Sequence, residues 1–136
     1  MQSRDNELRT KVLIEVNEDF HQADKVNDAL KTEILVEIIK ACKERDNTIR
    51  TLASSALTSV ANTSLGREII VNNNILPHIA ALFEDQVTMI RYNAYSCLIN
   101  FAEFTFGIQA IIDTDILRIL VDKLVIERED AILILI

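Results

Sequence analysis

Two histidines and two cysteines are the residues of this sequence best suited to metal binding or catalysis. His21 and His78 stand apart, without the cysteine or carboxylate spacing that builds a metal site. Cys42 and Cys97 fall inside apolar helical patterns, which is typical of reduced cysteines in a protein core. The sequence has no nucleophile elbow, P-loop or dinucleotide-binding glycine motif. We therefore predict that the protein is not an enzyme and holds no metal or cofactor.

The charge of the chain favours other proteins as its partners. Its formal net charge is −7 at pH 7, and an acidic domain repels nucleic-acid phosphates and anionic membrane surfaces. The acidic runs Glu18-Asp19 and Glu127-Arg128-Glu129-Asp130 are typical of inter-helix loops and helix starts. No apolar run reaches the roughly 18 residues of a membrane span, and Met1 to Asn6 do not resemble the start of a signal peptide. We expect a cytoplasmic protein that binds neither nucleic acid nor membrane.

Helices must position almost all of these residues. The tight reversals of an all-β fold require glycine and proline. The chain contains only 2 glycines and 1 proline, which is too few for such a fold. Apolar residues make up 49% of the chain, which is enough for extensive burial. The composition therefore predicts an all-α protein.

The helical pattern is repeated along the chain. When the sequence is shifted by 41 residues against itself, its central third aligns with its C-terminal third without a gap. Gly66 then meets Gly107, and Ile49-Arg50 meets Ile90-Arg91. The same offset brings Leu8-Arg9 onto Ile49-Arg50. Helix periodicity aligns some apolar positions by chance, but it does not also align glycines and arginines, so the repeat is real.

Each repeat reads as a set of helices. From Asn47 the apolar residues follow the i, i+3, i+4, i+7 rule of a helix with one buried face. Gly66 opens a short segment that ends at Val71, and Pro77 lies in the first turn of the next helix. HEAT units of two helices approach this length, but the short segment headed by glycine favours a three-helix unit. We predict a lone long helix over 5–21, repeats over 24–62 and 66–104, and a truncated repeat over 107–136.

The end of each long helix resembles the armadillo repeat. The family's Ala-Leu-x-Asn-apolar-Ala ending is matched by Cys97-Leu98-Ile99-Asn100-Phe101-Ala102, with cysteine for the first alanine. Ala56-Leu57-Thr58-Ser59-Val60-Ala61 matches it with serine in the asparagine position. The usual glycine before the medium helix is replaced by Asn74 and Asp115, which can adopt the left-handed conformation that the junction requires. The resemblance implies an armadillo-type α-solenoid, a right-handed superhelix of three-helix repeats.

Three further motifs fall at fixed positions of the repeats. They are Asn47-Thr48-Ile49-Arg50, Thr63-Ser64-Leu65-Gly66-Arg67, and Phe106-Gly107-Ile108-Gln109-Ala110-Ile111-Ile112 with Leu120-Val121-Asp122-Lys123-Leu124. They resemble the N-terminal repeats of radial spoke head protein 14 homologues, armadillo-type components of ciliary and flagellar axonemes. The resemblance implies a non-catalytic scaffold in the axonemal radial spoke of motile cilia, bound to other spoke or axonemal subunits. The alternative is a soluble armadillo adaptor that binds extended peptides of cargo or signalling partners in its concave groove.

The resemblance also locates a concave groove along the long helices. Peptide-binding armadillo arrays clamp a peptide backbone with asparagine ladders and hold its basic side chains with tryptophans. This chain has Asn100 but no tryptophan, so that mechanism is not expected here. Small polar residues in the groove either bind an extended segment or partner helix by hydrogen bonds, or form a solvated face. These candidate protein-binding residues are Thr51, Ser55, Ser59, Tyr92, Ser96 and Asn100.

One arginine recurs in each long helix, as Arg9, Arg50 and Arg91. One hypothesis is a ladder of cations that binds acidic protein tails. The other, which we favour, is that each arginine stacks the repeats by pairing with an acidic residue of its own or the neighbouring repeat, as in HEAT and armadillo arrays. The candidate acidic partners are Asp5, Asp46 and Asp85.

The last residues of the sequence, Ala131 to Ile136, are all apolar. A solenoid buries its apolar surface between neighbouring repeats rather than in one central core. We therefore expect this end to be covered by further repeats, by a partner or by a second copy, and we favour further repeats.

Overall fold

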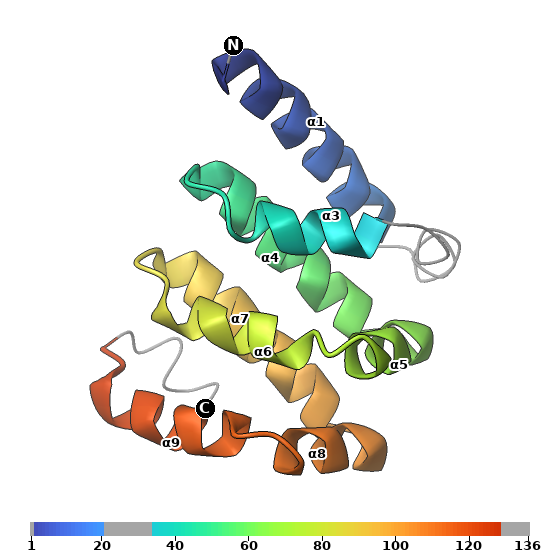
Figure 1. Ribbon diagram of the computed structural model, residues 1–136, viewed down its shortest axis with the longest axis vertical. Helices are drawn as coiled ribbons and strands as arrows, with labels where there is room; N and C mark the ends of the chain where they lie inside the picture. Colours follow the sequence, from blue (N-terminus) through green and yellow to red (C-terminus); the bar gives the residue numbers. More distant parts are fainter. Residues whose placement is uncertain (1, 21–33, 129–136) are drawn as a thin grey trace.

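The computed structural model describes residues 2–20 and 34–128, and all regular structure in these ranges is helical. The predicted all-α solenoid is confirmed: the helices stack one after another along the chain (Figure 1). In chain order the helices are α1 (Gln2–Phe20), α3 (Ile34–Ala41), α4 (Asn47–Ala61), α5 (Ser64–Asn72), α6 (Leu76–Ala81), the 3₁₀ turn η1 (Leu82–Glu84), α7 (Thr88–Ala102), α8 (Thr105–Ile112) and α9 (Ile116–Ile126).

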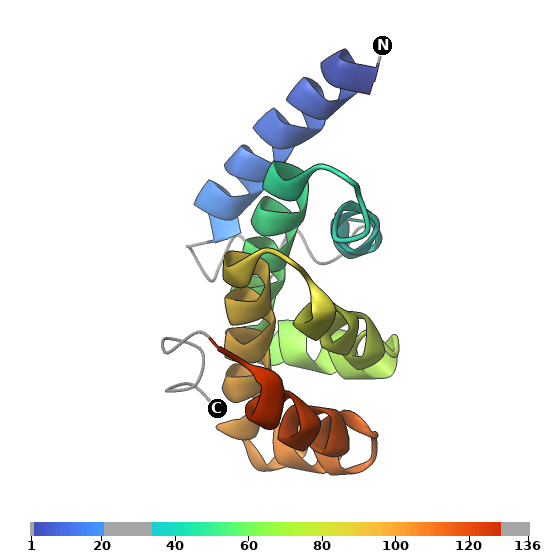
Figure 2. The same cartoon turned by 90° about the vertical axis from the view of Figure 1, so that its left-hand side faces the viewer.

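Two layers run along the molecule. The long helices α1, α4 and α7 lie side by side in one layer, and the shorter helices line the other side of them (Figure 2). α1 packs against α4, and α4 packs against α7. The medium helices pack against the long helix that follows each of them, α3 against α4, and α6 with η1 against α7.

The long helix α4 forms because its two ends are capped and one of its faces is apolar. The Asp46 side chain accepts the backbone N–H of Ile49 at 3.0 Å, which satisfies one of the open donors of the first turn. Ile49, Ala53 and Val60 point to the fully buried side of the helix. α7 repeats this pattern 41 residues later, with Ile90 in the place of Ile49.

The segment after α4 begins earlier than the sequence pattern predicts. α5 starts at Ser64, so Gly66 is its third residue and does not open it. The reason is Thr63, whose hydroxyl accepts the backbone N–H of Gly66 at 3.0 Å and caps the helix. The next junction is as predicted, since Asn74 has a positive φ of 54°. Pro77 also lies in the first turn of α6, as predicted.

Asp115 does not take the left-handed conformation predicted for it, and its φ is −75°. At the Asn74 junction the N–H of Ile75 reaches back to the carbonyl of Ile70 at 2.9 Å, which is the bond that a left-handed residue permits. Before α9, the Thr114 hydroxyl donates to the carbonyl of Ile111 at 2.8 Å and closes the turn instead. The two junctions therefore end their helices by different hydrogen bonds.

α7 and α8 meet at a sharp corner. The two helices are bent by 118° at the break between them. Taken together they have the length and hydropathy that a membrane span requires, but no single helix in the described ranges has both.

The lone long helix predicted over 5–21 is observed as α1, which begins at Gln2 and ends at Phe20. His21, residues 24–33 of the first predicted repeat, Glu129-Asp130 and the apolar stretch 131–136 lie outside the described residues. The helices fall at the predicted spacing, and the exact division into repeats stays a prediction.

Candidate functional site

The six candidate groove residues lie on two neighbouring helices. Three are spaced four residues apart on α4, and three occupy the equivalent positions of α7. Because α4 packs against α7, the two rows form one surface, which we call the polar stripe. Each of its side chains is half-buried. The polar stripe consists of Thr51, Ser55, Ser59, Tyr92, Ser96 and Asn100.

Three residues of the polar stripe use their donors inside the protein. The hydroxyls of Thr51 and Ser59 donate to carbonyls one turn earlier in α4, at 2.8 and 3.4 Å. The amide of Asn100 donates across to the carbonyl of Thr58 in α4, at 3.4 Å. Asn100 is therefore engaged between the helices, where an asparagine clamp for a peptide would need it free.

The other three residues of the polar stripe have uncommitted hydroxyls. Within the described part of the chain, the side chains of Ser55, Tyr92 and Ser96 make no hydrogen bond, although each is half-buried. Ser55 and Ser96 are equivalent positions of neighbouring repeats. The arrangement presents hydroxyl donors on a surface that a partner backbone could reach.

A row of polar contacts that the sequence pattern did not predict joins the long helices. Asn17 donates to the carbonyl of Leu52 at 2.9 Å, and Thr58 donates to the carbonyl of Asn93 at 3.0 Å. Both bonds join residues 35 apart, and Asn17 and Thr58 occupy the same position of the repeat. Their shared polarity in an otherwise apolar pattern was the available signal. These bonds set the register of each long helix against the next.

Arg50 is held at the junction of two repeats. Its Nε and Nη2 donate to the two carboxylate oxygens of Asp85 at 2.9 and 3.2 Å. Its Nη1 donates to the backbone carbonyls of Glu44 and Arg45 at 2.9 and 2.8 Å, in the loop just before α4. The guanidinium thus joins that loop, its own helix and the following repeat.

Arg91 repeats this geometry one unit later. Its Nε and Nη2 donate to the carboxylate of Glu127 at 3.1 and 3.2 Å. Its Nη1 donates to the carbonyls of Asp85 and Gln86 at 2.9 and 3.3 Å. Arg9 forms an ion pair with Glu44.

Of the predicted acidic partners, the structure pairs only Asp85 with an arginine of the series. The prediction for Asp46 is wrong, because its carboxylate caps α4. The prediction for Asp5 is also wrong, since Arg9 pairs forward along the array with Glu44. The side chain of Arg9 is 54% exposed, whereas that of Arg50 is 15% exposed. An acidic protein tail would therefore reach Arg9 far more readily than Arg50.

Arg67 of the Ser-Leu-Gly-Arg motif is buried and makes contacts between neighbouring repeats. It is buried in α5, and its Nη1 donates to the carbonyl of Ala61 at the end of α4, at 2.9 Å. Its guanidinium lies over the ring of Phe104, 3.6 Å from the ring centre. Burial lowers the pKa of Arg67, which stays cationic at neutral pH. Arg67 therefore links the corner after α4 to the equivalent corner after α7.

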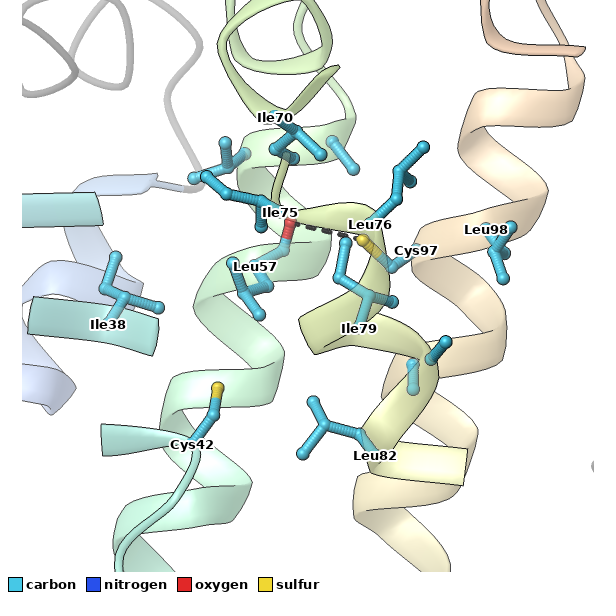
Figure 3. Close-up of a cluster of buried hydrophobic side chains, with 14 of the residues drawn as sticks. Ile38, Cys42, Leu57, Ile70, Ile75, Leu76, Ile79, Leu82, Cys97 and Leu98 are labelled. Carbon is cyan, nitrogen blue, oxygen red and sulfur yellow. Dashed lines mark hydrogen bonds between the residues drawn. The ribbon is translucent and has the colours of Figure 1, made fainter. Parts of the chain in front are cut away.

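The two cysteines are free and buried, on α7 and beside α3 (Figure 3). The thiol of Cys97 lies 3.7 Å from the carbonyl of Leu57, to which it donates. Burial raises the pKa of Cys42 from 9.0 to about 12 and also raises the pKa of Cys97. Neither thiol has the lowered pKa that a nucleophile or redox sensor requires.

We predict that neither Cys42 nor Cys97 reacts with a thiol reagent in the native protein at neutral pH. The pKa of Cys42 alone lowers its thiolate fraction about a thousandfold relative to an exposed cysteine. Labelling followed by mass spectrometry is expected to show both thiols reacting only at the rate of unfolding. Denaturant should restore full reactivity, and rapid labelling of the folded chain would contradict the observed burial.

His78 is half-buried on α6, where it lines a pocket together with Cys42, Glu44 and Asp85. Within residues 2–20 and 34–128, no three histidine, cysteine or acidic side chains gather closely enough to hold a metal ion.

The fold and these surfaces define a class, the helical-repeat α-solenoids, in which each unit packs on its neighbours. The HEAT repeat family model matches residues 75–105 of this chain. This stretch contains α6, η1 and α7, which are one medium helix with the long helix that follows it. HEAT repeats commonly mediate protein–protein interaction. The match supports a helical-repeat protein and does not single out the armadillo type.

Proposed function

We propose that the protein is a non-catalytic scaffold that binds other proteins through the polar stripe of α4 and α7. One observation carries the proposal: three half-buried hydroxyls, those of Ser55, Tyr92 and Ser96, make no hydrogen bond in the described chain. A half-buried donor without a partner gains free energy when a partner carbonyl satisfies it. The match of α6 to α7 with the HEAT repeat supports the same role.

Within this role, we propose an armadillo-type structural component of the axonemal radial spoke of motile cilia. The support is the sequence resemblance of the motifs that begin at Asn47, Thr63 and Phe106. The peptide adaptor is the second candidate, favoured by the uncommitted hydroxyls. Its asparagine clamp is opposed by the bond that Asn100 already makes to Thr58.

The double substitution Ser55→Arg and Ser96→Arg is expected to weaken partner binding at least about tenfold, because two bulky charges would cover the polar stripe. In ciliated cells, the tagged wild-type chain should sediment with salt-washed axonemes, and the double variant should move to the soluble fraction. Glu68→Arg on exposed α5 is the matched control and should sediment like wild type.

Two outcomes separate the parts of this proposal. A wild-type chain found wholly in the soluble fraction would exclude the spoke component. A double variant that sediments as well as wild type would exclude the polar stripe as the binding surface. Asn100→Ala is expected to change binding less than about twofold, whereas a peptide adaptor with an asparagine clamp would lose most of its affinity.

A further inference from the structure

The first long helix carries an apolar face that its equivalents bury. Leu8 of α1 is 63% exposed, although its equivalents Ile49 and Ile90 are fully buried. Val12 is likewise exposed where Ala53 is fully buried. α4 contacts the medium helix α3 in addition to α1, and α7 contacts α6 with η1 in addition to α4. Within the described residues, no medium helix of this kind precedes α1.

The last medium helix has the complementary exposed face. Leu117 of α9 is 54% exposed, although its equivalents Leu35 and Leu76 are buried. Leu124 is also exposed where Phe83 is buried. Leu35 and Leu76 lie on the medium helices α3 and α6, and Phe83 lies on η1; each of these elements packs against the long helix that follows it. In the described part of the chain, no long helix follows α9.

These two exposed faces are the two halves of one interface that the protein already makes twice. We propose that copies of the chain assemble head to tail, with α9 of one copy docked against α1 of the next. The docked α9 would pack against α1 of the next copy as α3 packs against α4. The inference does not rest on the proposed function, because Leu8 and Leu124 lie outside the polar stripe.

The shape of the docking seat supports a medium helix as its occupant. A groove of about 700 Å³ runs between α1 and α3, lined mainly by apolar side chains that include Leu8, Val12 and Ile38. In the next unit, Ile39 of α3 and Cys42, which directly follows α3, line the corresponding space between α4 and α6. α3 therefore lies beside α4 at the position where no described helix lies beside α1. The equivalents of Ile39 and Cys42 in α9 are Val121 and Leu124, and both are exposed.

Arg9 provides a polar contact that fits the same docked position of α9. Arg50 and Arg91 each bind two carbonyls of the loop just before their own long helix, but Arg9 bonds only to Glu44 within the described residues. The 41-residue offset from Asp85-Gln86 places the missing carbonyls at Ile126-Glu127 of the second copy.

The backbone there is suitable for this contact. Glu127, which ends α9, has φ −67° and ψ 133°, and Asp85, which ends η1 and lies 42 residues earlier, has −64° and 141°. The chain therefore leaves α9 in the same direction as it leaves η1, where the following loop carbonyls bind Arg91.

Such an interface joins two different surfaces, so each added copy leaves one new end open. The wild-type chain is expected to increase in mean mass with concentration in analytical ultracentrifugation. Leu8→Glu and Leu124→Glu should each raise the dissociation constant at least about tenfold and leave a monomer. Both residues are exposed, so the variants should keep the wild-type circular dichroism spectrum. Ile14→Glu, an exposed site on α1 outside the groove, is the matched control and should assemble normally.

Mixing the two variants is the decisive test. Leu8→Glu retains an intact α9 face, and Leu124→Glu retains an intact α1 face, so an equimolar mixture should form a heterodimer and nothing larger. A wild-type chain that stays monomeric at high concentration would overturn the proposal and leave these faces to another partner or a further segment. Assembly that survives Leu8→Glu, or a mixture that stays monomeric while wild type assembles, would also overturn it.

Discussion

Gly66→Ala and Gly107→Ala are each expected to lower the free energy of unfolding by about 3 kcal/mol. A Cβ atom at Gly66 would lie 2.0 Å from the carbonyl oxygen of Val60, and one at Gly107 would lie 1.9 Å from that of Phe101. Both obstacles are backbone atoms at the end of a long helix, so neither can move aside cheaply. The equivalent helices α5 and α8 can cross the ends of α4 and α7 this closely only because glycine has no side chain.

The sign of the change in unfolding free energy shows whether the close contact between helices or the helix propensity of alanine dominates. Neither glycine has a positive φ, so backbone conformation does not require them. In an exposed helix, replacing glycine by alanine stabilises by about 0.5–1 kcal/mol. Urea unfolding followed by circular dichroism measures the difference, with Glu68→Ala on the exposed side of α5 as the control. A Gly66→Ala protein as stable as wild type would contradict the packing described here.

Much of the fold could be predicted from the sequence repeat, because the repeat depends on residue spacing within one helix and on matching positions in neighbouring repeats. The spacing of apolar residues after Asn47 located α4, and the 41-residue offset paired Gly66 with Gly107 before any contact was known. The left-handed conformation of Asn74 followed from its place at a helix junction. Asp115 was one exception, because the Thr114 hydroxyl offered its turn another hydrogen bond. The start of α5 was another, because the Thr63 hydroxyl caps that helix two residues before Gly66.

The partners of the arginines and the state of the polar stripe could not be predicted in the same way. Which carboxylate meets Arg91 depends on how far each repeat is rotated on the next, and Glu127 lies 36 residues on, where Asp85 lies 35 residues after Arg50. Whether Asn100 faces solvent or Thr58 depends on the distance between α4 and α7. Both are properties of stacking geometry, which one residue pattern does not determine.

Arg50→Ala is expected to lower the free energy of unfolding by about 2–3 kcal/mol, whereas Arg9→Ala should change it by less than about 0.5 kcal/mol. Removal of Arg50 leaves the enclosed carboxylate of Asp85 without its main partner and two loop carbonyls without their donor. Arg9 makes one exposed ion pair, which solvent screens. Urea unfolding of the two variants at neutral pH makes the comparison, and equal losses would contradict it.

The Arg50–Asp85 pair should also make stability depend on pH in the acid range. Burial raises the pKa of Asp85, but hydrogen bonds from Arg50 and the Val87 N–H, with the charges of Arg50 and Arg91, lower it by more. Its pKa in the folded protein is therefore below the usual 3.8, so its contribution is complete above about pH 4 and is lost as the pH falls through the folded pKa. Asp85→Asn removes this titration, and the difference between wild type and variant should shrink steadily below that pH. If the difference in free energy of unfolding between wild type and Asp85→Asn stays constant from neutral to acid pH, Asp85 does not stabilise the stack through its charge.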